Sequence, residues 1–304
     1  MKPQVSVVLP ARNESAPIRD VVMRIRALLP EAEIIVVDDG SNDGTGEAAA
    51  KAGARVVRHP YSGGNGAAIK GGARAATGEV IVFMDADGQH DPADIPALLT
   101  RLDEGYDMVV GARQAGSQAS LGRGIANRFY NRLASYMTGH KIEDLTSGFR
   151  AVRAEKFREF LYLLPNGFSY PTTSTMAFFR AGYSVTYHPI HTAKRVGKSH
   201  IRLLHDGVRF LLIIFKIGTL YSPLKLFAPV SVALLFLGTS WYLYTFLALS
   251  RFTNMSALLI SAGIVIFMMG LISEQITSLM YKDAESMTDR NTAAEKKTSD
   301  QQPS

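Results

Sequence analysis

The sequence predicts an α/β domain with a mostly parallel sheet and helices on both of its faces, followed by two membrane-spanning helices. In the first half of the chain, short β-branched apolar runs alternate with segments of helical periodicity. Near the other end lie two long runs without a charged side chain. Alternating strands and helices build parallel sheets, and about 20 consecutive apolar residues are enough to cross a bilayer.

The expected elements follow from the spacing of the apolar residues. We expect strands at residues 5–9, 34–37, 54–57, 80–84, 108–110 and 184–187. We expect helices at residues 17–29, 45–52, 67–76, 92–102, 123–138, 155–163 and 172–181. Pro10 closes the first strand and Pro30 ends the first helix.

Composition narrows the class of protein. The 304 residues suffice for one large α/β domain with an appendage, or for two domains. A chain that is 47% hydrophobic and 20% charged is not intrinsically disordered. The absence of cysteine excludes disulfides and thiolate metal sites and fits a reducing compartment. The net charge of +6 suits anionic partners: nucleic acid, anionic lipid or phosphorylated substrates.

The two uncharged runs, at residues 226–249 and 252–273, predict two transmembrane helices within 225–282. A short connector makes them a hairpin with both ends on one side; a buried helical hairpin is the alternative. Only Arg251 lies in the connector. Cations flank the hairpin at Lys194, Arg195, Lys198, Arg202, Arg209, Lys216, Lys225, Lys282, Arg290, Lys296 and Lys297. The positive-inside rule then predicts an inner-membrane protein whose α/β domain and termini are cytoplasmic.

The segments around the hairpin are distinctive too. Residues 200–224 mix cations with Leu, Ile and Phe, which predicts interfacial amphipathic helices on the membrane; a core helix with a charged edge is the alternative. Glu274 lies within the second apolar run, either as a functional intramembrane carboxylate or near the headgroups. Residues 283–304 are polar and predict a disordered cytoplasmic tail.

An acidic turn, Asp85-Ala86-Asp87-Gly88-Gln89-His90-Asp91, follows the fourth strand directly. Ligands of open α/β sheets bind beyond the carboxyl ends of the strands. Mg²⁺ typically takes one or two carboxylates plus substrate phosphates. The turn is therefore a candidate metal site, with Gln89 as a further oxygen donor. The alternative is an acidic cap on the next helix, and Asp91 before Pro92 has the features of an N-cap.

Two further segments are weaker signals. Asp38 and Asp39 end the second strand, where they can accept hydrogen bonds from a ribose or a base edge, or form a polar β-turn. Residues 62–66 read Ser-Gly-Gly-Asn-Gly before a helix. Such a loop can cradle phosphate, although a plain turn explains it equally well. It is not the dinucleotide fingerprint, because no G-x-G-x-x-G follows the first strand.

Together, four segments resemble the family 2 glycosyltransferases, and more narrowly the dolichyl-phosphate mannosyltransferase and polyprenyl-phosphate glycosyltransferase group. They are Leu9-Pro10-Ala11-Arg12-Asn13-Glu14, Val37-Asp38-Asp39-Gly40-Ser41, Asp85-Ala86-Asp87-Gly88-Gln89-His90 and Gly111-Ala112-Arg113. The resemblance covers residues 4–220, and the C-terminal helices match the membrane-anchored members. It implies a GT-A type catalytic domain at residues 1–199.

The resemblance also implies site residues. The nucleotide would be held by Pro10, Arg12, Glu14, Val37, Asp39, Asp85 and Ala86. Asp87 and Gln89 would bind Mg²⁺ or Mn²⁺, and Asp87, Arg113 and Arg195 would act in catalysis. The acceptor phosphate would be held by Ser147, Arg150 and Lys198. For Arg195 and Lys198, a juxtamembrane patch that binds anionic lipid is the alternative.

Two departures from the mannosyltransferase pattern leave two features undetermined: which nucleotide base is bound, and the role of part of the basic loop at residues 195–200. Arg12 stands where an aromatic residue is usual, which bears on base stacking. The loop at residues 195–200 is a residue shorter, and His200 replaces the lysine after the serine.

The implied reaction is metal-dependent, inverting transfer of a sugar from a UDP- or GDP-sugar to a dolichyl or undecaprenyl phosphate. Another membrane acceptor, such as a glycolipid, and a non-catalytic membrane scaffold are the alternatives. Processive polysaccharide synthases carry Gln-x-x-Arg-Trp near the membrane, whereas the only tryptophan, Trp241, lies in an apolar run. Nucleic acid is not an expected partner, because the cations lack interleaved aromatic residues. A homo-oligomer is compatible with the sequence.

Overall fold

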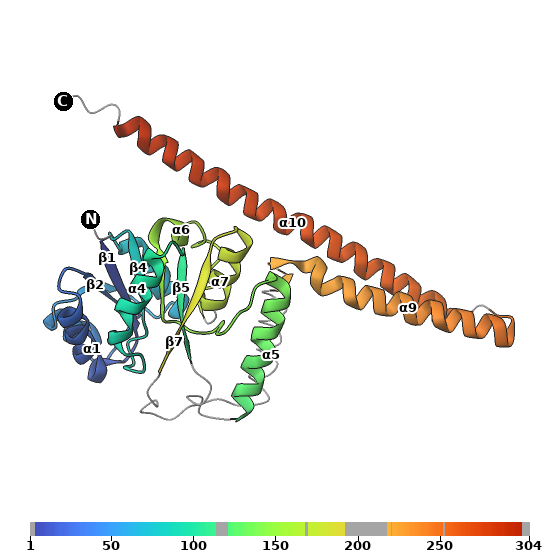
Figure 1. The fold of residues 1–304 in the computed structure, drawn as a ribbon, viewed down its shortest axis with the longest axis horizontal. Helices are drawn as coiled ribbons and strands as arrows, with labels where there is room; N and C mark the ends of the chain where they lie inside the picture. The colour runs from blue at the N-terminus through green and yellow to red at the C-terminus, as the bar shows by residue number, and fades with distance from the viewer. Residues whose placement is uncertain are drawn as a thin grey trace. The chain divides into compact units, whose positions relative to one another are not determined.

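The computed structural model describes residues 4–113, 121–167, 170–191, 218–219, 221–251 and 253–299. The chain divides into two compact units, Met1–Arg202 and Leu203–Ser304 (Figure 1). The first unit contains the α/β domain, and the second contains the two long apolar helices. The expected interfacial helices, together with Arg195 and Lys198, fall mostly within residues 192–217 and lie outside the described residues.

One seven-stranded sheet runs through the first unit, in the order β3-β2-β1-β4-β6-β5-β7. The strands are β1 (Val5–Ala11), β2 (Glu33–Asp38), β3 (Arg55–Arg58), β4 (Val80–Phe83), β5 (Met108–Arg113), β6 (Arg150–Arg153) and β7 (Val185–Ile190). Every neighbouring pair is parallel except those of β6, which is antiparallel to β4 and β5. The predicted mostly parallel sheet is confirmed. The sequence did not predict β6, a four-residue strand with arginine at both ends.

The helices agree with the expected ones at most positions. They are α1 (Ser15–Leu28), α2 (Thr45–Lys51), α3 (Asn65–Ala75), η1 (Pro92–Asp94), α4 (Ile95–Asp103), α5 (Leu121–Thr138), α6 (Ala154–Arg158) and α7 (Tyr170–Arg180). The helix expected at 155–163 is shorter. The amide of Phe160 bonds to the carbonyl three residues back, at Phe157, so tight turns replace the α-helix after Arg158.

Both faces of the sheet are covered, which explains why its central strands are continuously apolar. On one face Val7 and Leu9 of β1 belong to a buried cluster with α1 and α4. On the other face α3 packs closely: a methyl group placed on Gly72 would lie 2.2 Å from a side-chain carbon of Val8. Phe83 of β4 extends that second layer toward α6, with ring centroids 4.7 Å from Phe157.

The second unit consists mainly of α9 (Pro223–Leu249) and α10 (Asn254–Ser299) (Figure 1). The spans Pro223–Ala248 and Asn254–Leu279 have mean hydropathies of 1.7 and 2.4, and only 11% and 17% of their apolar windows is buried. Both helices are thus long and apolar enough to cross a membrane. α10 continues to Ser299, through most of the segment expected to be disordered. Residues 271–299 contain neither glycine nor proline to end the helix.

Polar contacts hold the hairpin together. The carboxylate of Glu274 accepts hydrogen bonds from the Leu224 amide at 3.2 Å and the Ser222 hydroxyl at 3.5 Å, so α10 caps the start of α9. The Ser231 hydroxyl donates to the Gly263 carbonyl at 2.8 Å, where small residues allow close approach of the helices. Glu274 therefore lies at the open end of the hairpin, opposite the connector. This placement favours a headgroup position over an intramembrane functional carboxylate.

Candidate active site at the carboxyl edge of the sheet

The parallel strands all end at one edge of the sheet, and β6 begins there because it runs the other way. Phe83, the last residue of β4, pairs with Arg150, the first residue of β6. The turn after β4 and the loop before β6 therefore leave the sheet side by side. Among the described candidates, those at or just after the ends of β1, β2, β4 and β5 lie at this edge: Pro10, Arg12, Glu14, Asp39, Asp85, Asp87, Gln89 and Arg113.

The loops after β1 and β2 are bound to each other. The Asp39 amide donates to the Ala11 carbonyl at 2.9 Å. The Asn13 amide donates to the Ser41 hydroxyl at 3.0 Å, and the Glu14 amide to the Thr45 hydroxyl at 2.9 Å. Asn13 has a φ of 55°, which asparagine tolerates better than most residues. The segment that contains Pro10, Arg12 and Glu14 thus lies beside Asp39, as a shared nucleoside site requires.

Asp39 is buried and its carboxylate is fully engaged by the protein. It accepts hydrogen bonds from Ser62 at 2.7 Å and from the amides of Gly63 and Gly64 at 2.9 Å each, and it contacts His59 Nδ1 at 2.8 Å. Burial raises the pKa of Asp39, but these hydrogen bonds outweigh it and lower the pKa. Asp39 therefore fixes the shape of the glycine loop, whatever it contributes to a ligand.

The glycine loop does not offer its helix terminus to a phosphate. The amides of Gly63 and Gly64 bond to Asp39, and two amides in the first turn of α3 bond to carbonyls of another loop. The Gly66 amide donates to the Gly167 carbonyl at 3.1 Å, and the Ala67 amide to the Asn166 carbonyl at 2.9 Å. The structure therefore supports a structural turn over the phosphate cradle.

Gly66→Ala is expected to destabilise the protein by at least about 2 kcal/mol, because overpacking a tight contact forces the backbone apart. A methyl group on Gly66 would lie 1.9 Å from the Pro165 carbonyl oxygen. Gly167→Ala is the matched control, since no atom of the residues that the structure describes lies within 4 Å of its methyl position. Unfolding of both variants in detergent solution measures the difference. Equal stability of the two would contradict the contact.

Two predicted nucleotide residues have buried side chains. Val37 is 0% exposed, lies within β2 between β1 and β3, and faces Gly72 of α3. Ala86 is 2% exposed and belongs to the core. Neither side chain can touch a ligand directly, so any contribution comes from the backbone or from support of the sheet.

The carboxylates of the acidic turn have different roles: Asp91 caps a helix, whereas Asp85 and Asp87 stay at the edge of the sheet. Asp91 caps η1 by accepting from the Ala93 amide at 2.9 Å, which confirms the predicted N-cap. Asp87 accepts from the Gln89 amide at 3.1 Å within a turn closed by Gly88 at φ 73°. The Asp85 side chain is 38% exposed, and its Oδ2 lies 3.5 Å from Nε2 of the buried His90. Asp85 and Asp87 therefore remain at the edge of the sheet.

Arg113 at the end of β5 forms a two-pronged ion pair with Asp144. Nε lies 2.7 Å from Oδ2, a terminal nitrogen lies 2.9 Å from Oδ1, and the same nitrogen donates to Thr146. Burial raises the pKa of Asp144, but hydrogen bonds from Arg113 outweigh it and lower the pKa. Asp144 thus fixes the plane of a guanidinium that is 28% exposed. The sequence singled out Arg113 but not this partner, for which no local spacing gives a signal.

The loop before β6 packs directly on Asp85. A methyl group on Gly148 would lie 3.1 Å from Asp85 Oδ2 and 3.2 Å from the Tyr170 hydroxyl, so this close approach suits glycine. Tyr170 donates to the Gly148 carbonyl at 2.9 Å and holds the loop in place. The neighbouring Ser147 is 1% exposed, and its hydroxyl has no hydrogen-bond partner among the described residues. The turn that carries the predicted nucleotide residue Asp85 therefore lies beside the loop that carries Ser147, a residue predicted to hold the acceptor phosphate.

Arg150 lies elsewhere than its predicted role requires. It is 0% exposed and its guanidinium donates to the Pro171 carbonyl at 3.0 Å, to Ser174 at 2.8 Å and to the Ser147 carbonyl. The antiparallel direction of β6 places its first side chain beneath α7. Arg150 thus joins α7 to the loop before β6 and does not face a ligand in this structure.

The residues present fit a metal ion that is shared with a diphosphate. Among the described residues, no group of three or more acidic or histidine side chains is placed to hold an ion alone. Asp87 and Gln89 offer one carboxylate and one amide oxygen on the same turn. Mg²⁺ usually completes such a partial set with substrate phosphates and water.

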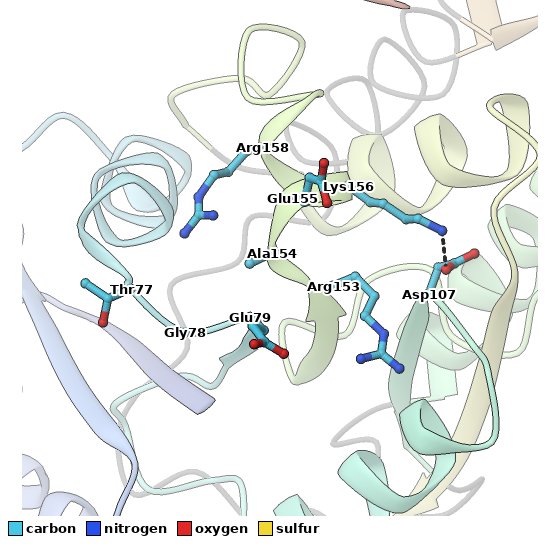
Figure 2. A pocket seen from close by; sticks show the side chains of 9 residues that line it. All are labelled: Thr77, Gly78, Glu79, Asp107, Arg153, Ala154, Glu155, Lys156 and Arg158. Atoms are coloured by element: carbon cyan, nitrogen blue, oxygen red, sulfur yellow. Dashed lines mark hydrogen bonds and ion pairs between the residues drawn. The ribbon is translucent and has the colours of Figure 1, made fainter. Parts of the chain in front are cut away.

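A separate hollow of about 510 Å³ lies at the opposite edge of the sheet (Figure 2). Its basic side chains bind neighbouring elements. Lys156 pairs with Asp107 at 2.6 Å, Arg153 donates to the Leu102 carbonyl at 3.0 Å, and Arg158 donates to the Ala76 carbonyl at 2.7 Å. These contacts indicate a structural junction.

Comparison with known proteins decides the family. The model of "Glycosyl transferase family 2" matches residues 6–161, and that of "GtrB C-terminal hairpin" matches residues 222–279. The chain belongs to glycosyl transferase family 2. It is 30% identical to Glycosyltransferase AglJ of Haloferax volcanii, over 90% of this chain and 94% of that protein. It is also 30% identical to an undecaprenyl-phosphate 4-deoxy-4-formamido-L-arabinose transferase of Aeromonas hydrophila, over 92% and 90% of the two chains.

A solved structure extends the likeness to the fold of the glycosyltransferase domain. Glucosyl-3-phosphoglycerate synthase from Mycobacterium tuberculosis, in complex with Mn²⁺, UDP and phosphoglyceric acid, aligns with a TM-score of 0.58 at 25% identity. The alignment covers 71% of this chain and 78% of the synthase. The GT-A type fold predicted for this glycosyltransferase is thereby confirmed.

Proposed function

We propose that this glycosyltransferase transfers a sugar from a UDP- or GDP-sugar to a polyprenyl phosphate, with inversion, at the cytoplasmic face of the inner membrane. The observation that carries the proposal is the close approach of Gly148 to Asp85, which brings the predicted nucleotide turn beside the loop before β6 that carries Ser147. A relative that matches most of the chain is named for an undecaprenyl-phosphate acceptor. The apolar hairpin would keep the enzyme in the membrane that contains such an acceptor.

The donor occupies the edge above β1, β2 and β4. Pro10, Arg12 and Glu14 line one side of the nucleoside, and Asp85 contacts it from the turn after β4. Asp39 acts mainly by fixing the neighbouring glycine loop. The buried Val37 and Ala86 support these contacts from below.

Asp87 and Gln89 would hold Mg²⁺ or Mn²⁺ at the diphosphate end of the donor. The bound ion supplies charge neutralisation for the leaving nucleoside diphosphate. The Mycobacterium tuberculosis synthase binds Mn²⁺ or Mg²⁺ with UDP, which supports this assignment. Arg113, whose guanidinium is oriented by Asp144, adds positive charge near the donor diphosphate and the acceptor phosphate. Arg195 is assigned a second positive charge at the diphosphate, the role that the resemblance implies for it.

The acceptor phosphate is bound by Lys198, beside the loop that carries the buried Ser147. A phosphate oxygen attacks the anomeric carbon, its new bond forms as the bond to the diphosphate breaks, and the diphosphate leaves with the electron pair. Attack from the opposite side inverts the configuration. No strong general base is required, because a lipid phosphate is already anionic near neutral pH.

The proposal is tested with the purified full chain in lipid nanodiscs. Polyprenyl phosphate is supplied with a panel of labelled UDP- and GDP-sugars, with Mg²⁺, Mn²⁺ or a chelator. We expect one donor to give a labelled lipid product that depends on the lipid phosphate and on the metal. Transfer to a glycolipid or a soluble acceptor, with none to the lipid phosphate, would refute the acceptor assignment.

A further inference from the structure

The outer face of α5 carries aromatic side chains where a soluble domain would place polar ones. Phe129 is 63% exposed and Tyr136 is 57% exposed. They are separated by two helical turns, so they lie on one face. Arg128 and Arg132 are also exposed. Arg128, Arg132 and Tyr136 follow one another at intervals of four residues, and Phe129 lies three residues before Arg132, so the four side chains share one side of the helix. We call Arg128, Phe129, Arg132 and Tyr136 the α5 outer face.

The side chains on the inner face of α5 are already buried against the domain. Tyr130 is 4% exposed, Ala134 is 5% exposed and Met137 is 3% exposed. The Tyr130 hydroxyl donates to Thr172 of α7 at 3.3 Å. The α5 outer face is therefore not needed for the core of the domain. The exposed aromatics Tyr61 and Tyr162 lie singly on loops of the first unit, whereas those of α5 form a pair.

The two arginines of this face have no acidic partner in the part of the chain that the structure describes. Among the described residues, no carboxylate lies within ion-pair distance of Arg128 or Arg132. Aromatic rings sit at the headgroup level of bilayers, and unpaired arginines are attracted to anionic lipid. The chain carries a hairpin that is long and apolar enough to bring this domain to a membrane.

We propose that the α5 outer face rests on an anionic membrane surface, with Phe129 and Tyr136 among the headgroups and Arg128 and Arg132 against lipid phosphates. This contact is separate from the segment at residues 200–224 for which the sequence predicts interfacial helices. It requires insertion of the hairpin, but it does not depend on the identity of the transferred sugar or of the acceptor.

The contact has a consequence for catalysis, which rests on the proposed function. Asn131 of α5 donates to the Glu143 carbonyl at 2.6 Å and accepts from the Leu145 amide at 3.2 Å. Ser135 of α5 accepts from the Ile142 amide at 2.9 Å. These bonds attach the loop that carries Asp144 to α5. An α5 helix on the membrane therefore holds this loop at the depth of lipid phosphates.

Because the chain lacks cysteine, single cysteines can report the contact. Tyr136→Cys and Tyr162→Cys form a matched pair, since the two tyrosines are 57% and 55% exposed. Each full-length variant carries an environment-sensitive fluorophore in vesicles of phosphatidylcholine, with or without phosphatidylglycerol. We expect nitroxide at headgroup depth to quench the label at 136 several-fold more than the label at 162, and most strongly with phosphatidylglycerol. Equal quenching of both labels would overturn the proposal.

A third label separates this inference from the membrane attachment on which it depends. Phe236→Cys, on α9, is expected to be quenched by nitroxide deep in the acyl chains. Quenching at 236 without quenching at 136 overturns the α5 contact alone. Absence of quenching at both sites overturns the insertion of the hairpin as well. Shielding of the label at 136 in detergent, with disulfide cross-linking of unlabelled Tyr136→Cys between copies, assigns the face to a protein interface and overturns the membrane contact.

The charge contribution is tested by reversing both arginines in the Tyr136→Cys background. Arg128→Glu with Arg132→Glu is expected to weaken the contact at least about fivefold for each arginine replaced. Arg19→Glu with Lys51→Glu makes the same charge change on α1 and α2, on other exposed positions of the domain. Quenching at 136 that falls equally in both double variants would show a net-charge effect and overturn the local contact.

Discussion

Asp87→Asn is expected to lower the turnover number on the order of 10²–10³-fold while the protein stays folded. The substitution keeps an oxygen that can accept from the Gln89 amide, so the turn closed at Gly88 is preserved. It removes the negative charge that an ion bound to Asp87 and Gln89 requires. Steady-state transfer to polyprenyl phosphate, measured at increasing Mn²⁺ concentration, separates a weaker metal site from slower chemistry.

Asp91→Asn is the control from the same turn. Asp91 accepts from the Ala93 amide and pairs with Arg24 at 2.7 Å, with both side chains about half exposed. Asparagine caps a helix as well as aspartate does, and an exposed ion pair contributes at most about 1 kcal/mol. Turnover should therefore remain near that of the unmodified enzyme. An equal loss in Asp87→Asn and Asp91→Asn would show that the turn matters for folding and not for metal binding.

The features that the sequence predicts well depend on local patterns. Strands β1, β2 and β4 are short apolar runs, and burial on both faces of the sheet demands that composition. The N-cap at Asp91 needs only a polar side chain before Pro92. The apolar hairpin follows from composition alone. Each of these is decided within a few residues of the chain.

The features that the sequence missed depend on distant residues. β6 forms because β4 and β5 leave a space between them that Arg150–Arg153 fills, and its own sequence gives little strand signal. Arg150 looks like a phosphate ligand until Pro171 of α7, 21 residues further along the chain, provides its carbonyl as the partner. The carboxylate of Asp39 looks available until Ser62 and the glycine loop return to it.

Replacing either member of the Arg113–Asp144 pair is expected to reduce catalysis, but in different ways. Arg113→Lys keeps the charge and loses the planar fork that bonds to both carboxylate oxygens, so kcat/KM should fall by on the order of 10²-fold. Asp144→Asn keeps Arg113 but removes the carboxylate that orients its guanidinium. By analogy with residues that orient a ligand from behind, its loss should be on the order of 10–100-fold. The product of the single losses should exceed the loss in the double variant, because the two residues act as a unit.

The same pair gives a pH dependence with a defined sign. The pKa of Asp144 is lower in the folded protein than in the unfolded chain, where it is about 3.9. The ion pair therefore contributes stability above that pH and loses it as the pH falls through the lower folded-state pKa. Asp144→Asn should destabilise the protein near neutral pH by about 1–3 kcal/mol, and its stability should decline less below about pH 4.

Denaturation midpoints from neutral pH to pH 3 test this sign directly. The curves of the unmodified protein and Asp144→Asn should converge as the carboxylate becomes protonated, because the ion pair is then lost in both. Glu104→Gln is a matched control: Glu104 pairs with Arg101 at 3.2 Å, but both side chains are about half exposed. It should follow the unmodified curve throughout. The contrary result is an Asp144→Asn curve that stays parallel to the curve of the unmodified protein down to pH 3. The lost stability would then come from packing around residue 144 rather than from its charge. Arg113 would in that case need another group to fix its orientation.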